Sequence, residues 1–247
     1  MQNSGNTSSE HKQNGNKLLK QYKEDMNLTT NSCTFVEQRS SPIVFRQKPL
    51  NVIFRKGWPV VQRYEGEGSS PHVIDASHAI KLDIQDMALN DIRPLGLKIP
   101  HKPGQSAVYK KQNLIINRLN EVQAVIWQLN PDTAVIPEGP QYTDVTDSYL
   151  LLALSGNNIF DIAERLSTLD MMDPKLTCPV VLQGSFLHVP SQIVVVTREA
   201  TDGLIFVACS RGYGHSFLSA LFHALKSFDL RPAGEQALNK TLAALRD

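Results

Sequence analysis

The sequence has few cysteines and almost no net charge. Its three cysteines, Cys33, Cys178 and Cys209, are far apart and lack the CxxC or Cys/His spacing of a zinc site. We therefore expect unpaired thiols in a cytoplasmic protein. The 25 basic and 24 acidic side chains leave a net charge of +1, which gives no field to hold a nucleic-acid backbone or an anionic membrane. We expect neither nucleic acid nor membrane as a partner.

Long apolar runs and catalytic motifs are also missing. The amino terminus has no apolar run, so we expect neither a signal peptide nor a membrane anchor. The motifs GxSxG, GxxxxGK[ST] and HExxH are absent. Gly212 and Gly214 before a predicted helix resemble part of a dinucleotide loop, but Phe217 stands where the third glycine belongs. We expect no catalytic, cofactor-binding or metal-binding residue in this chain.

Residues 1–42 are rich in Asn, Gln, Ser and Lys and poor in large apolar side chains. Such a composition buries too little apolar surface to offset the entropy of ordering, so we expect a mostly disordered polar tail. Within it Leu18, Tyr22 and Met26 recur at a spacing of four and could share one helical face. They are candidate partner contacts, or they belong to a transient solvated helix.

Residues 43–247 are predicted to form a single α+β domain. Apolar β-branched and aromatic runs predict short strands over 42–64, 179–182, 186–189, 193–196 and 204–208. Residues 121–129 and 133–137 flank Asn-Pro-Asp and predict a hairpin.

A strand over 149–154 is predicted to turn into a helix over 159–166, with Asn157 or Asn158 as its cap. A second helix should follow residues 210–214, because Phe217, Leu221 and Leu225 fall on one apolar stripe. A terminal helix is predicted within 233–247, docked on this domain or on a partner. This order favours a mixed or antiparallel sheet with helices on one face over a doubly wound parallel sheet.

The polar segment 210–216 precedes that second helix. Amides at a helix start can bind an anion with help from Arg211, so Arg211, Tyr213 and His215 are candidate partner contacts. In the alternative interpretation Ser210 or Ser216 caps the helix and Arg211 is solvated.

Short motifs between Trp127 and Leu230 carry a family resemblance. WQLNPDTAVIPEG, VTDSY followed by LLLALSG, the Leu169-Asp170-Met171 segment and the Leu204–Val207 strand with Ser210-Arg211 occur in that order. Together they resemble the gamma subunit of heterotetrameric sarcosine oxidase. The chain has Asn130 in place of the family's Gly, and Ser167-Thr168 in place of a Gly-Cys-Pro approach. That family's fold is similar to part of the folate-binding glycine-cleavage T-protein.

The resemblance implies a non-catalytic subunit beside alpha, beta and delta chains. In such a complex FAD, FMN, NAD and tetrahydrofolate are expected in the partner chains, which oxidise an N-methyl amine and pass the one-carbon unit to tetrahydrofolate. The alternative is a free-standing folate-dependent aminomethyl or methyl transferase. It would need a carboxylate such as Asp144 or Asp147, although both positions also suit turn capping. A third reading, a folate-like module serving iron–sulfur or transfer-RNA maintenance, fits the near-neutral charge poorly for RNA.

Overall fold

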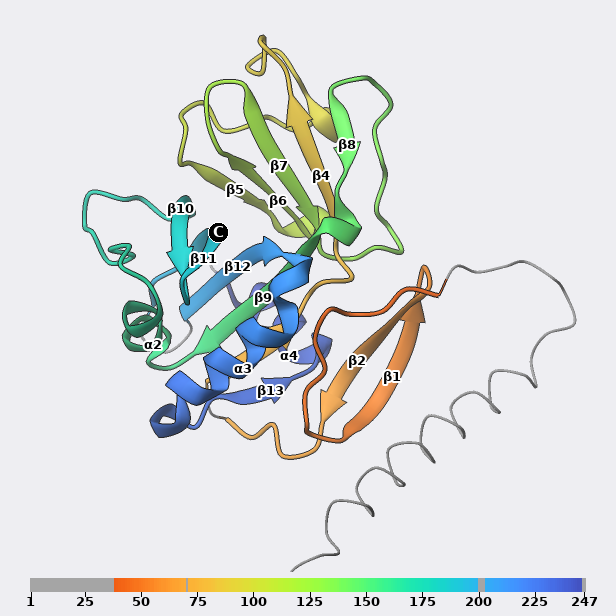
Figure 1. Ribbon diagram of the computed structural model, residues 1–247. Helices are drawn as coiled ribbons and strands as arrows, with labels where there is room; N and C mark the ends of the chain where they lie inside the picture. Colours follow the sequence, from red (N-terminus) through yellow and green to blue (C-terminus); the bar gives the residue numbers. More distant parts are fainter. Residues whose placement is uncertain (1–37, 70, 200–202, 246–247) are drawn as a thin grey trace, which may run out of the picture. The chain divides into compact units, whose positions relative to one another are not determined.

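The centre of the fold is a six-stranded sheet that is buried on both faces (Figure 1). The computed structural model describes residues 38–69, 71–199 and 203–245. The strand order is β10, β11, β12, β9, β3 and β13, with bounds Val180–Phe186, Val189–Thr197, Gly203–Ser210, Tyr149–Gly156, His72–Asp75 and Arg231–Ala233. Neighbouring strands are antiparallel except β13 and β3, so the sheet is mixed. Successive residues of β9 and β12 point to opposite buried faces, which explains their continuous apolar sequences.

Helices α2 (Ile159–Leu166) and α3 (Gly214–Ala224) cover one face of this sheet. Ile162 of α2 and Leu221 of α3 are fully buried there, as the predicted apolar stripes require. The predicted strand, turn and helix over 149–166 are confirmed. The predicted side-chain cap is wrong, because Asn158 takes a left-handed conformation with φ of 58° and its side chain makes no capping bond.

A five-stranded antiparallel sheet packs on the other face. Its order is β5, β6, β7, β4 and β8, with bounds Ser106–Tyr109, Leu114–Arg118, Gln123–Gln128, Ile80–Gln85 and Tyr142–Asp144. Trp127 faces the central sheet, 6.1 Å from the ring of Phe206. The outer face is covered by the irregular segment 86–99, which inserts Leu89 and Ile99. The α+β class with mixed and antiparallel sheets is therefore confirmed.

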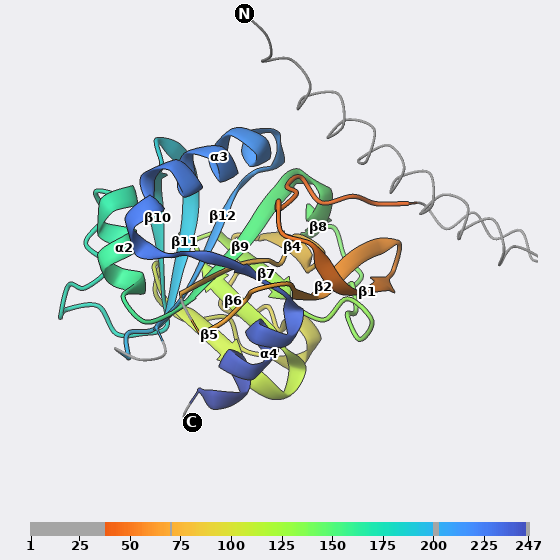
Figure 2. The same ribbon diagram turned by 90° about the horizontal axis from the view of Figure 1, so that it is seen from below.

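Helix α4 (Glu235–Ala244) lies on the opposite side of the central sheet from α3 (Figure 2). Its Leu238 and Leu242 join the core between the two sheets, so the terminal helix docks on this domain. The expectation of helices on one face holds for α2 and α3 but not for α4. No helix in residues 38–245, gaps aside, has the length and apolarity needed to span a membrane.

A two-stranded hairpin of β1 (Pro49–Arg55) and β2 (Trp58–Tyr64) confirms the strands expected after Pro42. Its turn places Lys56 and Gly57 at positive φ of 43° and 84°. Trp58 is 1% exposed and belongs to the core. Short 3₁₀ turns are η1 (Pro94–Gly96), η2 (Lys110–Gln112), η3 (Thr146–Ser148), η4 (Arg211–Tyr213) and η5 (Lys226–Phe228).

The hairpin predicted across Asn130-Pro131-Asp132 is wrong. Strand β7 pairs with β6 and β4 instead, and residues 133–137 form no strand. The Gln128 side chain explains the difference, because its amide donates to the Val135 carbonyl and accepts from the Val135 amide. These bonds occupy the backbone of Val135, whose side chain is 56% exposed.

Residues just before Pro42 also contact the domain. Residues 38–247 form one compact unit by their contacts. Ser41 donates to Asp75, and the amide of Arg39 donates to the Gly57 carbonyl at 3.0 Å. The stretch 39–42 therefore belongs with the domain. Leu18, Tyr22, Met26 and Cys33 lie outside the described residues.

Candidate functional site

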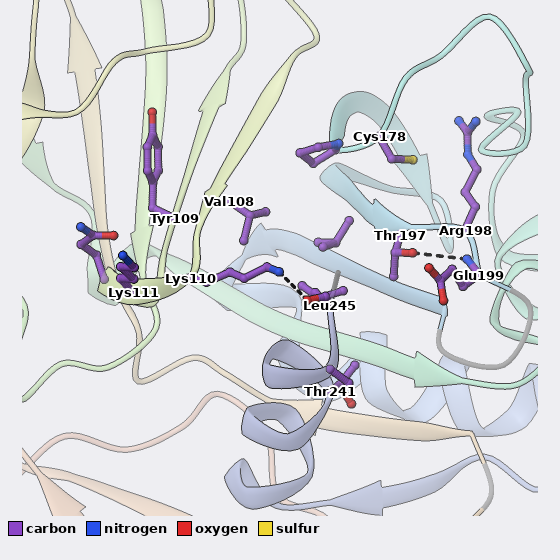
Figure 3. Close-up of a pocket in the computed structure, with 14 residues that line it drawn as sticks. Val108, Tyr109, Lys110, Lys111, Cys178, Thr197, Arg198, Glu199, Thr241 and Leu245 are labelled. Atoms are coloured by element: carbon purple, nitrogen blue, oxygen red, sulfur yellow. Dashed lines mark hydrogen bonds between the residues drawn. The ribbon is translucent and has the colours of Figure 1, made fainter. Parts of the chain in front are cut away.

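A groove lies between η2 and α4 (Figure 3). It consists of two cavities of about 810 and 430 Å³, which share the wall formed by residues 108–111. Helix α4 lines both cavities, and the end of β11 with Cys178-Pro179 lines the larger one. We call this feature the α4 groove.

The floor of the α4 groove is apolar because it is built from the ends of core strands. Leu114 and Ile115 of β6 and Leu242 of α4 line the smaller cavity and are each at least nine-tenths buried. Val196 of β11 lines the larger cavity and is 7% exposed. Such a floor provides apolar surface for the body of a bound molecule.

The walls of the α4 groove carry more positive than negative charge. Four basic side chains line the two cavities, together with two acidic ones: Arg55, Lys110, Lys111, Arg198, Glu199 and Glu235. Lys110 reaches across to donate a hydrogen bond to the Leu245 carbonyl at the end of α4, where a cation is favourable. Arg55 pairs with Glu235, and Arg198 bonds to backbone carbonyl oxygens, so much of this charge is used within the domain.

Arg198 and Cys178 lie at one end of the larger cavity. The Arg198 guanidinium donates to the carbonyl oxygens of Asp173 at 3.1 Å and Leu176 at 2.9 Å, so it holds the loop before Cys178. Burial raises the pKa of the Cys178 thiol, and the charge of Arg198 only partly opposes this. The thiol is therefore protonated near neutral pH, which makes it a poor nucleophile.

A buried polar network lies at the other end, around Glu235. Its carboxylate accepts hydrogen bonds from Gln62 Nε2 at 2.6 Å and Arg55 Nη2 at 2.9 Å, and His78 Nε2 lies 3.2 Å from the second oxygen. Burial alone would raise the pKa of Glu235, but its bonds to His78, Gln62 and Arg55 outweigh burial and lower the pKa to about 2. Glu235 thus stays ionised and joins β1 and β2 to the start of α4.

Lys81 of β4 is also buried, with 1% exposure, but it lies outside the grooves. Burial lowers the pKa of its amine to about 7. The Nζ atom donates to three backbone carbonyl oxygens, those of Ser77, Ala79 and Thr146, at 2.7 to 3.2 Å. These contacts use all three donors of the ammonium group, so Lys81 stabilises the turns around β4.

The candidate contacts of the segment 210–216 separate into two kinds. Arg211 is half-buried, with its guanidinium 5.8 Å from the centre of the Trp58 ring and a bond to the Ser40 carbonyl. Its guanidinium thus packs against Trp58 and bonds to the backbone, while its Nη1 atom has no hydrogen-bond partner among the described residues. Tyr213 is 47% exposed. His215 is exposed and lines a second groove, formed by α3 and residues 42–47, which we call the α3 groove.

Asp144 and Asp147 stand at the entrance to β9, where the alternative transferase needed a carboxylate. Asp144 accepts a hydrogen bond from the Thr146 amide at 2.9 Å, which is the turn-capping geometry. Asp147 lies 3.8 Å from Arg39, with a side chain 58% exposed. Neither residue lines the α4 or the α3 groove.

Sequence reasoning missed the residues that form the α4 groove. Lys110 and Lys111 lay in a stretch with no strong periodicity, although adjacent lysines after a β-branched and aromatic strand are a detectable signal. Glu235 follows Gly234 at the start of the terminal helix, a position that favours an acidic residue. Its partners lie 157 to 180 residues away in the chain, so no local pattern reveals them.

The described side chains hold no assembled metal site. Among residues 38–245, outside the short gaps, no cluster of three His, Cys, Asp or Glu side chains could hold an ion. Burial raises the pKa of Cys209 to about 11, so this thiol too is protonated near neutral pH.

No family model matches the sequence, and no curated protein matches it. The fold is similar to a chain of the heterotetrameric sarcosine oxidase from Corynebacterium sp. U-96 in complex with pyrrole 2-carboxylate. The TM-score is 0.52 at 14% identity, over 66% of this chain and 87% of that chain. It is also similar to the glycine cleavage system aminomethyltransferase T from Bartonella henselae, with a TM-score of 0.50 at 16% identity, over 76% of this chain and 56% of that one.

The covered shares also compare the sizes of the chains. The matched sarcosine oxidase chain is shorter than this chain, because the same aligned residues are a larger share of it. The aminomethyltransferase is longer, and this chain spans only about half of its length. At this identity the likeness establishes the fold alone.

Proposed function

We propose that this chain is a non-catalytic, gamma-type subunit of a heterotetrameric, flavin-dependent sarcosine oxidase-like complex. The observation that carries the proposal is the fold likeness to a sarcosine oxidase chain, of which 87% is covered. The likeness covers most of that smaller chain but only 56% of the aminomethyltransferase, so the shared fold corresponds more fully to the sarcosine oxidase chain.

The state of the titratable side chains supports a structural role. Glu235, with a pKa of about 2, and Lys81, with a pKa of about 7, both form hydrogen bonds within this domain. Cys178 and Cys209 are held as thiols by burial. A general base or nucleophile needs a reachable partner on the substrate, and these groups are used within the fold.

The partners in this proposal are alpha, beta and delta chains. They would carry FAD, FMN, NAD and tetrahydrofolate, oxidise an N-methyl amine such as sarcosine, and pass the one-carbon unit to tetrahydrofolate. This chain would contribute surface that holds the larger chains in place. Exposed apolar side chains at Val44, Leu50 and Phe54 are consistent with such a surface.

Co-expression tests the proposal. The chain should be purified alone and together with alpha, beta and delta chains encoded beside its gene, and each sample examined for flavin absorbance and sarcosine-dependent reduction of an electron acceptor. We expect the isolated chain to be colourless and the complex to contain it in stoichiometric amount. Stoichiometric flavin on the isolated chain, or partners that assemble fully and turn over equally without it, would contradict the subunit role.

A free-standing folate-dependent aminomethyl or methyl transferase is the second candidate. The likeness to aminomethyltransferase T and the basic α4 groove favour it. Asp144 and Asp147 weigh against it, because one caps a turn and both lie outside the grooves. Titration of the isolated chain with tetrahydrofolate separates the candidates, since micromolar binding to the chain alone is expected only of the transferase.

A further inference from the structure

The α3 groove is an apolar trough of about 650 Å³ on the outer side of α3. Along the helix its lining residues recur at spacings of three and four: His215, Leu218, Ser219, Phe222 and His223. Lys226 follows just beyond the helix, in η5. Those from His215 to His223 form a single stripe, so the trough runs along α3 for roughly 12 Å at 1.5 Å per residue. That length matches about two turns of a second helix.

The floor of the α3 groove is fixed by aromatic contacts. Phe45 is 6% exposed and meets Phe222 edge-on at 6.2 Å and Tyr64 edge-on at 5.5 Å. Ile43 is equally buried, whereas Val44 between them is 84% exposed. The segment 42–47 therefore turns alternate side chains inward and outward, and Val44 adds apolar surface at the rim.

The segment 42–47 is held at its start by a close approach to α3. The Pro42 carbonyl oxygen lies 2.6 Å from where a Cβ at Gly214 would stand, so only glycine allows this contact without a shift. Ser41 also donates to Asp75, which fixes the preceding residue. The groove is thus a formed feature of the domain surface.

The charges around the α3 groove have one sign. Arg46 and Lys226 stand at its margins, both exposed, and within the described part of the chain neither makes an ion pair. His215 and His223 are the other titratable residues among those that line it, and no acidic side chain is in that set. His223 is exposed.

We propose that the α3 groove binds an acidic amphipathic helix of a partner subunit. Apolar side chains of that helix at positions i, i+3 or i+4, and i+7 would enter the trough, and its carboxylates would face Arg46 and Lys226. The charge complementarity selects an acidic occupant, because opposite charges at a rim speed association and exclude basic segments. The identity of the partner as a subunit rests on the proposed function, while the groove and its charge do not.

The test uses the full chain co-expressed with its alpha, beta and delta partners. Arg46→Glu with Lys226→Glu reverses both margin charges, and Val44→Ser removes the exposed apolar side chain. Lys98→Glu with Lys175→Glu is the matched control, since it makes the same change in net charge at exposed positions outside the groove. Dissociation constants come from dilution series measured by mass photometry.

We expect the charge reversal to weaken assembly more than tenfold and Val44→Ser to weaken it severalfold, with melting temperatures and the control assembly unchanged. Equal weakening in the control and groove variants, or none in either, overturns the groove assignment and leaves the subunit role standing. Failure of the parent chain to assemble at all overturns the proposed function and this inference with it.

Hydrogen exchange on the isolated chain checks two other occupants. If removal of residues 1–37 speeds exchange of the α3 and 42–47 amides, the chain's own amino-terminal segment fills the groove and the proposal is wrong. It is also wrong if the isolated chain self-associates and the charge reversal abolishes that association, because a second copy is then the occupant. Parental exchange rates in a monomer support a groove left open for the partner.

Discussion

Replacing Glu235 by Gln should destabilise the domain at neutral pH. The carboxylate is 5% exposed and serves Arg55, Gln62 and His78 together. Its pKa of about 2, against an ordinary value of 4.5, corresponds to roughly 3 kcal/mol of folding free energy at 1.36 kcal/mol per unit. Glutamine removes the charge and places its NH₂ group against the N–H donors of Arg55 and Gln62. We therefore expect the unfolding free energy to fall by about 3 kcal/mol.

The effect should depend on pH in a definite direction. The folded pKa of Glu235 lies below the unfolded value, so its stabilisation is complete above pH 4.5 and is lost as the pH falls toward 2. At pH 3 about 2 kcal/mol of it should already be gone, by the same relation. The difference between the parent and the Glu235→Gln variant should shrink by that amount between pH 7 and pH 3.

Urea unfolding followed by the fluorescence of Trp58 and Trp127, both buried, measures this difference. Glu164→Gln is the control, because Glu164 lies exposed on α2 and should change stability by less than about 0.5 kcal/mol. The network does not stabilise the contact of β1 and β2 with α4 if Glu235→Gln lowers the unfolding free energy no more than the control does. The same conclusion follows if the loss is equal at pH 7 and pH 3.

Three further changes probe the packing. Gly234→Ala should cost more than about 2 kcal/mol in urea unfolding, because its Cβ would lie 2.2 Å from the Gln62 backbone, whereas Gly212→Ala meets open space and should cost little; similar costs would contradict this. Leu221→Asp should abolish the cooperative melt seen by circular dichroism, since it leaves an unpaired charge at a fully buried site; a parental melt would place Leu221 at an exposed surface. The difference in unfolding free energy between the parent and Lys81→Met should grow in the parent's favour between pH 7 and 10. In this range the folded amine, with a pKa of about 7, binds fewer protons than the unfolded amine. A difference that stays constant across this range would refute the lowered pKa.

Local sequence patterns predicted the elements of the central layer. Continuous apolar runs gave β9 and β12, and apolar stripes at helical spacing gave α2, α3 and the terminal helix. These features depend on which faces of one segment are buried, and that information is contained in a window of about ten residues. The α+β class followed from the order of such elements.

Strand pairing was not determined locally. The segment around Val135 is apolar and follows a turn, as the second strand of a hairpin would. The Gln128 side chain nevertheless bonds to the backbone of Val135, and β7 pairs with β6 and β4 instead. Several segments could pair with β7 on residue type alone. The choice among them depends on the register and burial of whole sheets, which only the complete fold supplies.

The candidate sites required the tertiary structure for the same reason. Lys110 and Glu235 both line the α4 groove although they are more than 100 residues apart in the sequence. Similarly, the hydrogen bond from Ser41 to Asp75 helps to hold residues 42–47 beside α3. The sequence by itself determined the near-neutral charge, the apolar stripes and the unclustered cysteines. The grooves, their charges and the lowered pKa of Glu235 arise from long-range packing, because electrostatic and desolvation energies depend on neighbours in space and not on neighbours in the chain.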